Sequence, residues 1–225
     1  MLTVALTGGI AAGKSVVAHL LAEKGCYVQS SDRLAHELMK PGRPAWRQIV
    51  AHFGPEILNP DKTVNRRRLG AIVFNSPKER HFMNRLIHPL VLAKKKRTVR
   101  VLEKKGAHKI FVSEAALTIE SGFIPFFDKV IVVHCPEELQ IERLMKRDGI
   151  TRREAGQRIR SQMPTAEKIK RADYLIETSG SLDDTAAQTQ KVYRQLLQDQ
   201  RSKNRANKPA TVKMRRPVRR REAGS

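Results

Sequence analysis

The chain has 225 residues, of which 40% are hydrophobic, and carries a formal net charge of +22 at pH 7. This length suits one main domain with a smaller inserted or appended part, and the positive charge favours polyanionic ligands such as nucleotides, phosphates or nucleic acid. Cys26 and Cys135 lie outside any C-x-x-C pair, which argues against a zinc site or a disulfide and predicts buried structural thiols. No run of about 18 apolar residues occurs, which argues against a membrane span and predicts a soluble, cytoplasmic protein.

The first 31 residues are typical of a β-α-β unit. Residues 2–6 are a short apolar run of strand character, and residues 15–24 place apolar side chains at helical spacing. A second strand at residues 26–28 leads into polar residues 30–32, which cap a helix beginning near residue 33.

The connection between this first strand and helix matches the phosphate-binding pattern G-x-x-x-x-G-K-[ST] at every required position. Its glycines let successive backbone N–H groups point at phosphates, and the helix N-terminus adds partial positive charge. We expect Lys14 to bridge the β and γ phosphates of ATP and the Ser15 hydroxyl to bind Mg²⁺. The alternatives are a glycine turn with an incidental lysine, or an inactive relic. The expected nucleotide-binding residues are Gly8, Gly9, Ile10, Ala11, Ala12, Gly13, Lys14, Ser15 and Val16.

Amphipathic segments punctuated by Pro, Gly and Asn fill residues 33–106, where no clear strand occurs. We interpret residues 32–106 as a helical insertion between the two parts of a core, 1–31 and 107–200. Short apolar runs at 109–113 and 129–133 predict strands buried on both faces of a parallel sheet, and 172–176 predicts a last strand. Strands alternating with helices indicate a doubly wound α/β fold.

The second half of the chain contains an arginine-rich segment and a basic end. A helix is expected from Pro136 to about residue 146, and the polar stretch 147–171 suits a mobile lid. A last helix is expected from Ser181 to about residue 198. Residues 201–225 contain ten Lys or Arg and one acid, which is typical of a disordered tail capable of nonspecific contact with polyanions.

Several separated segments together resemble the dephospho-CoA kinase family, in that family's order and spacing. They span about residues 2–197 and read LTGGIAAGKS, SSDRLAHEL, NRRRLGAIVF, IHPLV, ESGFIPFFDKVIVVHCPEELQIERLMKRDGIT and QMPTAEKIKRADYLI. The resemblance implies a three-layer P-loop kinase core with a parallel sheet, a helical substrate-binding insertion and a lid. It also implies transfer of the γ-phosphoryl group of ATP to the ribose 3'-hydroxyl of dephospho-CoA, the last step of coenzyme A biosynthesis.

The resemblance also assigns roles to two carboxylates. Asp32 stands where the family has its catalytic aspartate, and a carboxylate there can orient or deprotonate the attacking hydroxyl; the alternative is a helix N-cap. Glu114 stands at the end of a strand where the family commonly has aspartate, and can hold Mg²⁺ through water; the alternative is an exposed surface glutamate. The chain departs from the family at Ser30, where an aspartate is usual, and at Ala115-Ala116 after Glu114.

Four basic residues complete the expected site. Arg143 and Arg147 share one face of the helix that enters the lid and match the family's lid arginines, with Arg143 expected to be the stronger phosphate ligand and a catalytic residue. Arg66 and His88 occupy positions that resemble the family's substrate-binding segments. For each of the four, the alternative is an ordinary surface, cap or turn residue.

Two other functions fit some of these features. One is a kinase for a nucleoside monophosphate or another small hydroxylated metabolite, which shares the same loop, insertion and lid. The other is a nucleic-acid-binding protein that uses its phosphate loop as a switch. The basic tail lacks interleaved aromatic residues, so sequence-specific recognition of nucleic acid is not expected.

Overall fold

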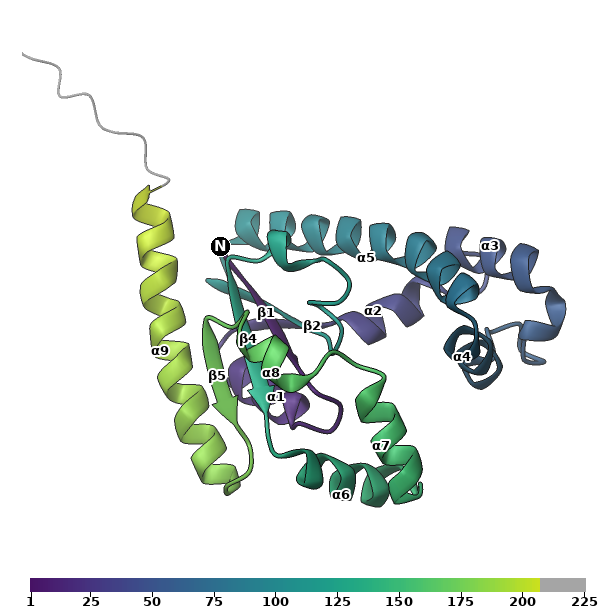
Figure 1. The fold of residues 1–225 in the computed structure, drawn as a ribbon. Coiled ribbons are helices and arrows are strands. Elements are labelled where there is room, and N and C mark those ends of the chain that lie inside the picture. Colours follow the sequence, from purple (N-terminus) through teal and green to yellow (C-terminus); the bar gives the residue numbers. More distant parts are fainter. Residues whose placement is uncertain (207–225) are drawn as a thin grey trace, which may run out of the picture.

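The computed structural model describes residues 1–206, which form an α/β fold around one parallel sheet (Figure 1). All strand pairings are parallel and the strand order is β2-β3-β1-β4-β5. The predicted α/β fold with a parallel sheet is therefore confirmed. The strands are β1 (Leu2–Gly8), β2 (Tyr27–Ser30), β3 (Ile110–Glu114), β4 (Lys129–His134) and β5 (Tyr174–Glu177).

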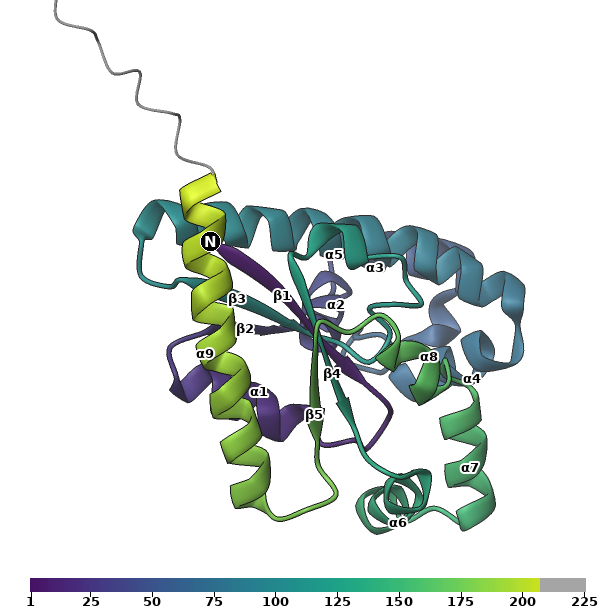
Figure 2. The same ribbon diagram turned by 60° about the vertical axis from the view of Figure 1, so that its left-hand side comes forward.

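Both faces of the sheet are buried, which explains the continuous apolar runs of its central strands. Leu2, Val4 and Leu6 of β1 pack on one face against α1 (Lys14–Glu23) and α9 (Leu182–Ala206). Figure 2 shows α9 running along this face. On the opposite face, Ala5 of β1 and two valines of β4 pack against the short helix η2 (Ile124–Phe126), against α8 (Thr165–Ile169) and against residues next to them.

The helices between β2 and β3 have a hydrophobic core of their own. The last and longest of them, α5, begins within this helical part and then runs back along the sheet (Figure 1). Ile49, Leu69, Met83 and Ile87 are among the buried residues of this second core. The elements are α2 (Ser31–Leu38), α3 (Pro44–Phe53), η1 (Pro55–Ile57), α4 (Arg66–Asn75) and α5 (Pro77–Lys105).

The arginine-rich stretch 147–171 contains helical structure that its composition did not predict. It begins at the end of α6 (Glu137–Asp148) and includes α7 (Arg152–Arg160) and α8. Thr151 starts α7 with a reciprocal capping box to Glu154. Ala155 of α7 is fully buried against two apolar residues of α6 and against Ile10 of the phosphate loop. This stretch therefore packs on the loop between β1 and α1 through an apolar contact.

The last helix is longer than expected. It was expected to end near residue 198, but α9 continues to Ala206. Lys203 connects this extension to the sheet, because its ammonium donates a hydrogen bond to the Met1 carbonyl oxygen at 3.0 Å and forms an ion pair with Asp128 at 2.6 Å. The expected start of the tail at residue 201 is corrected accordingly: residues 201–206 are helical. The remainder of the expected tail, 207–225, lies outside the described residues.

Two smaller expectations concern the thiols and the membrane. Cys26 and Cys135 are free and buried, as predicted. Burial raises the pKa of Cys26 to about 12, so this thiol stays protonated and chemically inert near neutral pH. In the described part of the chain, every helix is too short or too polar to cross a lipid bilayer.

Candidate active site

The carboxyl ends of the central strands bring the expected site residues together at one edge of the sheet. In the strand register, Glu114 at the end of β3 lies opposite Leu6 of β1 on one side and opposite Ser30 of β2 on the other. β1 ends two residues later, at Gly8, where the phosphate loop begins. Asp32 follows in the first turn of α2. Three consecutive strands of the sheet therefore direct a loop and two carboxylates to the same place.

Two glycines are needed for the shape of the phosphate loop. A Cβ on Gly8 would lie 2.1 Å from the Val133 carbonyl oxygen of the neighbouring strand, so no side chain fits there. Gly13 has φ 84° and caps α1 in the left-handed region, which L-residues with a Cβ rarely adopt. The loop can therefore turn sharply from β1 into α1 and leave its N–H groups at the helix N-terminus.

Lys14 folds back over this loop. Its ammonium donates to the carbonyl oxygens of Gly8 at 3.2 Å and Gly9 at 2.8 Å. Burial lowers the pKa of Lys14 to about 8 and the nearby Lys168 adds to this, whereas the carboxylates of Glu114 and Asp32 act in the opposite direction. The ammonium is thus held in a partly desolvated position, where an anionic ligand would stabilise its charge.

A cavity of about 540 Å³ opens between the phosphate loop, the first turn of α2, the middle of α5 and the segment after β3. It is large enough for a nucleotide-sized molecule. Besides Ile10, Ala11 and Gly13 of the phosphate loop, the expected site residues that line it are Lys14, Ser15, Asp32, His88, Glu114 and Arg147. The structure therefore gathers, around one cavity, six residues that are dispersed over 134 positions of the sequence.

Arg143 and Arg147, expected to act together, have different surroundings. The Arg143 guanidinium donates to the Thr178 carbonyl oxygen at 2.6 Å and to the Thr178 hydroxyl at 3.1 Å, and that hydroxyl donates to the Ala12 carbonyl oxygen at 2.9 Å. Arg143 thereby connects the segment after β5 to the phosphate loop and is not among the residues that line the cavity. Arg147, one turn later, does line the cavity and pairs with Asp148.

Arg66 also lies apart from the main cavity. It borders a separate hollow of about 290 Å³ within the helical part, next to His36 and Lys40. After burial, its positive charge is the main cause of the lowered pKa of His36. His88, the other expected substrate-binding residue of the helical part, does line the main cavity, and burial lowers its pKa.

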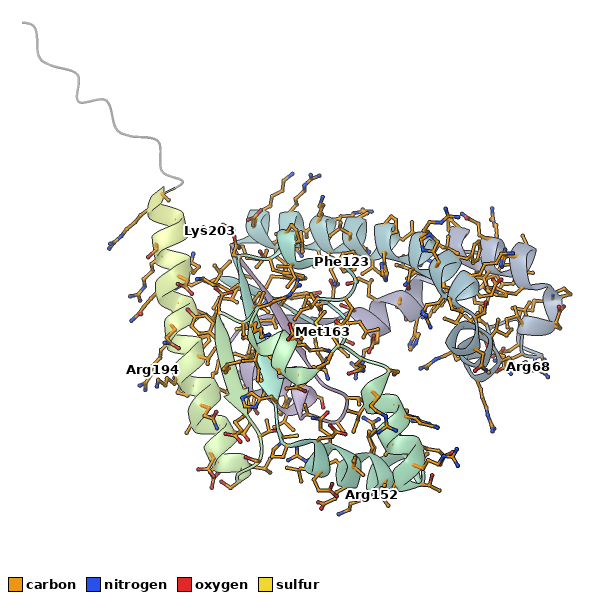
Figure 3. All side chains as sticks on the ribbon, in the orientation of Figure 1. Arg68, Phe123, Arg152, Met163, Arg194 and Lys203 are labelled. Carbon is orange, nitrogen blue, oxygen red and sulfur yellow. The ribbon has the colours of Figure 1, made fainter. Side chains whose placement is uncertain are left out.

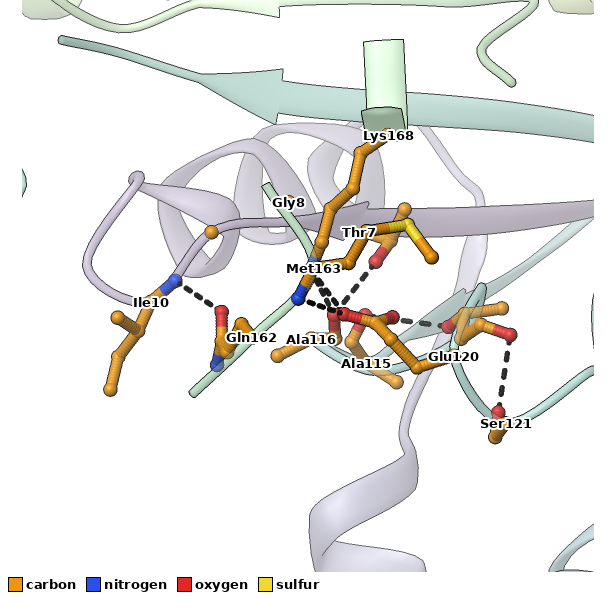
Figure 4. A network of polar contacts seen from close by, with 12 residues as sticks. Thr7, Gly8, Ile10, Ala115, Ala116, Glu120, Ser121, Gln162, Met163 and Lys168 are labelled. Atoms are coloured by element: carbon orange, nitrogen blue, oxygen red, sulfur yellow. Dashed lines mark hydrogen bonds and ion pairs between the residues drawn. The ribbon is translucent and has the colours of Figure 1, made fainter. Parts of the chain in front are cut away.

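Sequence reasoning missed a polar network behind the phosphate loop (Figure 4). Lys168 of α8 is fully buried; its ammonium pairs with Glu120 at 2.9 Å and donates to the Ala116 carbonyl oxygen at 2.9 Å. The same carbonyl accepts a hydrogen bond from the Thr7 hydroxyl at 3.1 Å. The network therefore joins β1, the segment after β3 and α8. The only sign of Lys168 in the sequence was its place in the segment QMPTAEKIKRADYLI.

Gln162, in the turn between α7 and α8, contacts the phosphate loop directly. Its side-chain oxygen accepts a hydrogen bond from the backbone N–H of Ile10 at 3.0 Å (Figure 4). Gln162 also lines the main cavity. No local pattern in the sequence indicates this contact, because its two partners are 152 residues apart.

The oxygen groups at the cavity suit Mg²⁺. Mg²⁺ takes hard oxygen ligands, keeps several waters and is bound through one or two protein groups together with substrate phosphates. The Ser15 hydroxyl and the carboxylates of Asp32 and Glu114 line the same cavity. Within residues 1–206 no cluster of three or more His, Cys, Asp or Glu side chains is placed to hold a metal unaided. The site therefore fits a metal that arrives with a nucleotide.

Comparison with known proteins identifies relatives over most of the chain. The family model of dephospho-CoA kinase matches residues 2–184. A dephospho-CoA kinase of Geobacillus kaustophilus is 43% identical over 194 residues, covering 86% of this chain and 96% of its own. The dephospho-CoA kinase of Syntrophus aciditrophicus is 40% identical over 201 residues, covering 89% of this chain and 86% of its own.

Solved structures with a similar fold include one of a dephospho-CoA kinase. A dephospho-CoA kinase from Campylobacter jejuni superposes with a TM-score of 0.65 at 30% identity, covering 88% of this chain and 98% of its own. A protein from Thermus thermophilus superposes with a TM-score of 0.74 at 29% identity, covering 88% of this chain and 97% of its own. A shikimate kinase from Acinetobacter baumannii, at 19% identity and a TM-score of 0.50, shares the fold.

Proposed function

This chain belongs to the dephospho-CoA kinase family, and from that premise we propose that it transfers the γ-phosphoryl group of ATP to the ribose 3'-hydroxyl of dephospho-CoA, which yields coenzyme A. The observation that carries the proposal is the meeting of Lys14, Ser15, Asp32 and Glu114, from three neighbouring strand ends, around one cavity. Phosphoryl transfer depends on positioning and electrostatic stabilisation, and such a cavity supplies both.

On the nucleotide side, the N–H groups at the start of α1 would bind the phosphates of ATP, and Lys14 would leave the loop carbonyls to reach them. Ser15, with Glu114 acting directly or through a water, would hold Mg²⁺. When bound, the metal neutralises phosphate charge that develops during transfer. The residues of this loop would thus fix the γ-phosphate next to the opening of α2.

On the acceptor side, Asp32 would accept a hydrogen bond from the 3'-hydroxyl and align it with the phosphorus atom. The acceptor would lie between α5 and the segment after β3, against His88 and Phe123. The carboxylate can take the hydroxyl proton as the new O–P bond forms and the bond from the γ-phosphorus to the bridging oxygen breaks, which releases ADP. The proton is then held at Asp32 until solvent removes it.

Of the two lid arginines, Arg147 is better placed to contact the transferred group, because it lines the cavity at the end of α6. Arg143 would act by holding Thr178 against the phosphate loop. Closure of residues 147–171 over the cavity would exclude water, which competes with the 3'-hydroxyl as phosphoryl acceptor. ATP hydrolysis without an acceptor should then be slow.

The direct test supplies purified protein with Mg-ATP and dephospho-CoA, and in parallel with AMP, cytidine monophosphate, adenosine or no acceptor. ADP formation and the mass of the product are followed together. Coenzyme A is expected only with dephospho-CoA. Use of another acceptor would keep the kinase fold and refute the substrate; no turnover with any acceptor would refute the activity.

A second test changes the proposed catalytic carboxylate. Asp32→Asn keeps the shape of the side chain but cannot accept the proton, so kcat should fall by about 10²- to 10⁴-fold while the Kd of ATP stays nearly constant. Steady-state kinetics and nucleotide titration measure the two quantities. Turnover at the wild-type rate would remove Asp32 from the proposed role.

A further inference from the structure

Lys95, in the middle of α5, is a buried cation that has no hydrogen-bond partner among residues 1–206. Its side chain is fully buried, and its ammonium makes no hydrogen bond within the described structure. A buried ammonium normally has a carboxylate or several acceptors around it, because desolvation of an unpaired charge is costly. Its neighbours in the sequence, Lys94 and Lys96, are exposed to solvent, as lysines usually are. The position of Lys95 therefore calls for a physical explanation.

The surroundings of Lys95 connect it to the cavity. Its ammonium lies 5.4 Å from the ring centre of Phe123 and 5.6 Å from that of Phe127, at cation–π distance. Figure 3 labels Phe123, which lies beside α5. Phe123 lines the cavity and its ring is 5.0 Å from that of His88, another lining residue. The Phe123 ring is thus next to both the ammonium and the cavity.

Two titratable groups face Lys95 in the described structure. They are Asp32 of α2, whose charge stabilises the ammonium, and His88 of α5, whose pKa Lys95 helps to lower. From the segment before β4, the rings of Phe123 and Phe127 face the ammonium. Burial lowers the pKa of Lys95 to about 8, so the ammonium is largely charged at neutral pH.

We propose that Lys95 is a specificity-determining residue for the acceptor. Its buried positive charge, behind the cavity wall, attracts the phosphate groups that an anionic acceptor brings into the cavity. The inference rests on the proposed function, since dephospho-CoA carries a pyrophosphate. A charge behind an apolar wall acts through a low-dielectric medium and is screened much less than a surface lysine. Within residues 1–206 no carboxylate forms an ion pair with this ammonium, and Asp32 acts on it only at a distance, so part of the attraction remains available to the ligand.

The first test compares Lys95→Met, which keeps the length of the stem and removes the charge, with Lys96→Met, which removes an exposed charge from the same helix. The Kd of dephospho-CoA, measured by calorimetry at pH 7, is expected to rise about tenfold in Lys95→Met. In Lys96→Met it should stay within about twofold of wild type. Equal Kd values for the two variants would overturn the proposal.

The stability of the same two proteins separates this role from a structural one. An uncompensated buried charge destabilises the folded state, so Lys95→Met should melt at a higher temperature than wild type, whereas Lys96→Met should melt unchanged. A lower melting temperature for Lys95→Met would mean that its ammonium is well compensated by the rings, and would overturn the proposal.

A third measurement needs no folded variant. An anion bound on the cavity side of the Phe123 ring raises the pKa of the Lys95 ammonium above 8. Binding of dephospho-CoA to wild type at pH 8 should therefore take up protons, which calorimetry in buffers of different ionisation enthalpy detects. Binding without proton uptake would contradict the inference. If wild type instead makes no coenzyme A from dephospho-CoA, the proposed function fails. If wild type makes coenzyme A but the expected changes in Kd, melting temperature and proton uptake are absent, only the role of Lys95 fails.

Discussion

Lys14 illustrates how one residue combines a role encoded locally with a charge state set by its surroundings. Its place in the phosphate loop follows from the motif alone, whereas its pKa of about 8 comes from burial and from the neighbouring charges of Lys168, Glu114 and Asp32. A lysine with such a pKa carries its charge near neutral pH and loses it in mildly alkaline solution. The phosphate loop should therefore be sensitive to pH.

We expect the affinity for MgATP to fall as pH rises through 8. The charged form of Lys14 binds phosphate, so above its folded-state pKa each binding event must first take up a proton. The same lowered pKa makes the free energy of unfolding of the free protein increase as pH rises from 8 to about 10.4. In that range the Lys14 side chain holds its proton in the unfolded chain but not in the folded one. Nucleotide titrations from pH 6.5 to 9 measure the first effect. A Lys14→Met control should bind weakly at every pH, and a pH-independent wild-type Kd would contradict the expectation.

Among the elements, α8 is short but anchors the end of the expected lid. Its Lys168 holds both the Glu120 carboxylate and the Ala116 carbonyl oxygen, and these two residues belong to the segment that lines the cavity after β3. Glu120 in turn accepts the Met163 backbone N–H at 3.3 Å (Figure 4). The segment after α7 is thus held to the segment that lines the cavity after β3 by one ion pair, of which Lys168 is fully buried.

Replacing Lys168 by Met should lower the free energy of unfolding by about 2 to 4 kcal/mol, since it leaves Glu120 and the Ala116 carbonyl without their buried donor. The matched control is Lys170→Met, because Lys170 is exposed and pairs with Glu167 across one turn. Its loss should change stability by at most about 0.5 kcal/mol. Urea denaturation measures both. Equal effects of the two variants would show that the Lys168 pair is not an anchor.

At the scale of the whole molecule, the first residue and the end of α9 meet at the edge of the sheet opposite the site. Lys203 of α9 contacts the Met1 carbonyl oxygen and Asp128, the residue before β4. Asp128 also accepts hydrogen bonds from the backbone N–H and the hydroxyl of Thr3, both at 2.7 Å. The end of α9 is therefore part of the folded domain.

The position of a truncation should decide its effect on stability. Removing residues 207–225 deletes seven Lys or Arg and one acid, and should weaken salt-sensitive attraction to RNA without changing stability or phosphoryl transfer. Removing residues 201–225 also deletes Lys203 and should lower stability by about 1 kcal/mol. RNA binding at two salt concentrations and urea denaturation test both truncations. Equal stability of the two would contradict the role given to Lys203.

The sequence by itself determined the features whose signals are local. The phosphate loop, its flanking strand and helix, the helical stretch after β2 and the buried strands can all be inferred from neighbouring residues, because strand and helix periods and turn chemistry act within a few positions. The resemblance added Asp32, Glu114, His88 and Arg147, which do line one cavity.

Only the tertiary structure decided the features that depend on contacts between distant residues. Arg143 and Arg147 share a helix face, yet packing of the segment after β5 directs one to Thr178 and leaves the other at the cavity. The Lys168–Ala116 hydrogen bond joins residues 52 positions apart, and the burial of Lys95 depends on rings from the segment before β4. Local patterns hold no information on such partners, because strand order and helix packing determine which distant segments meet.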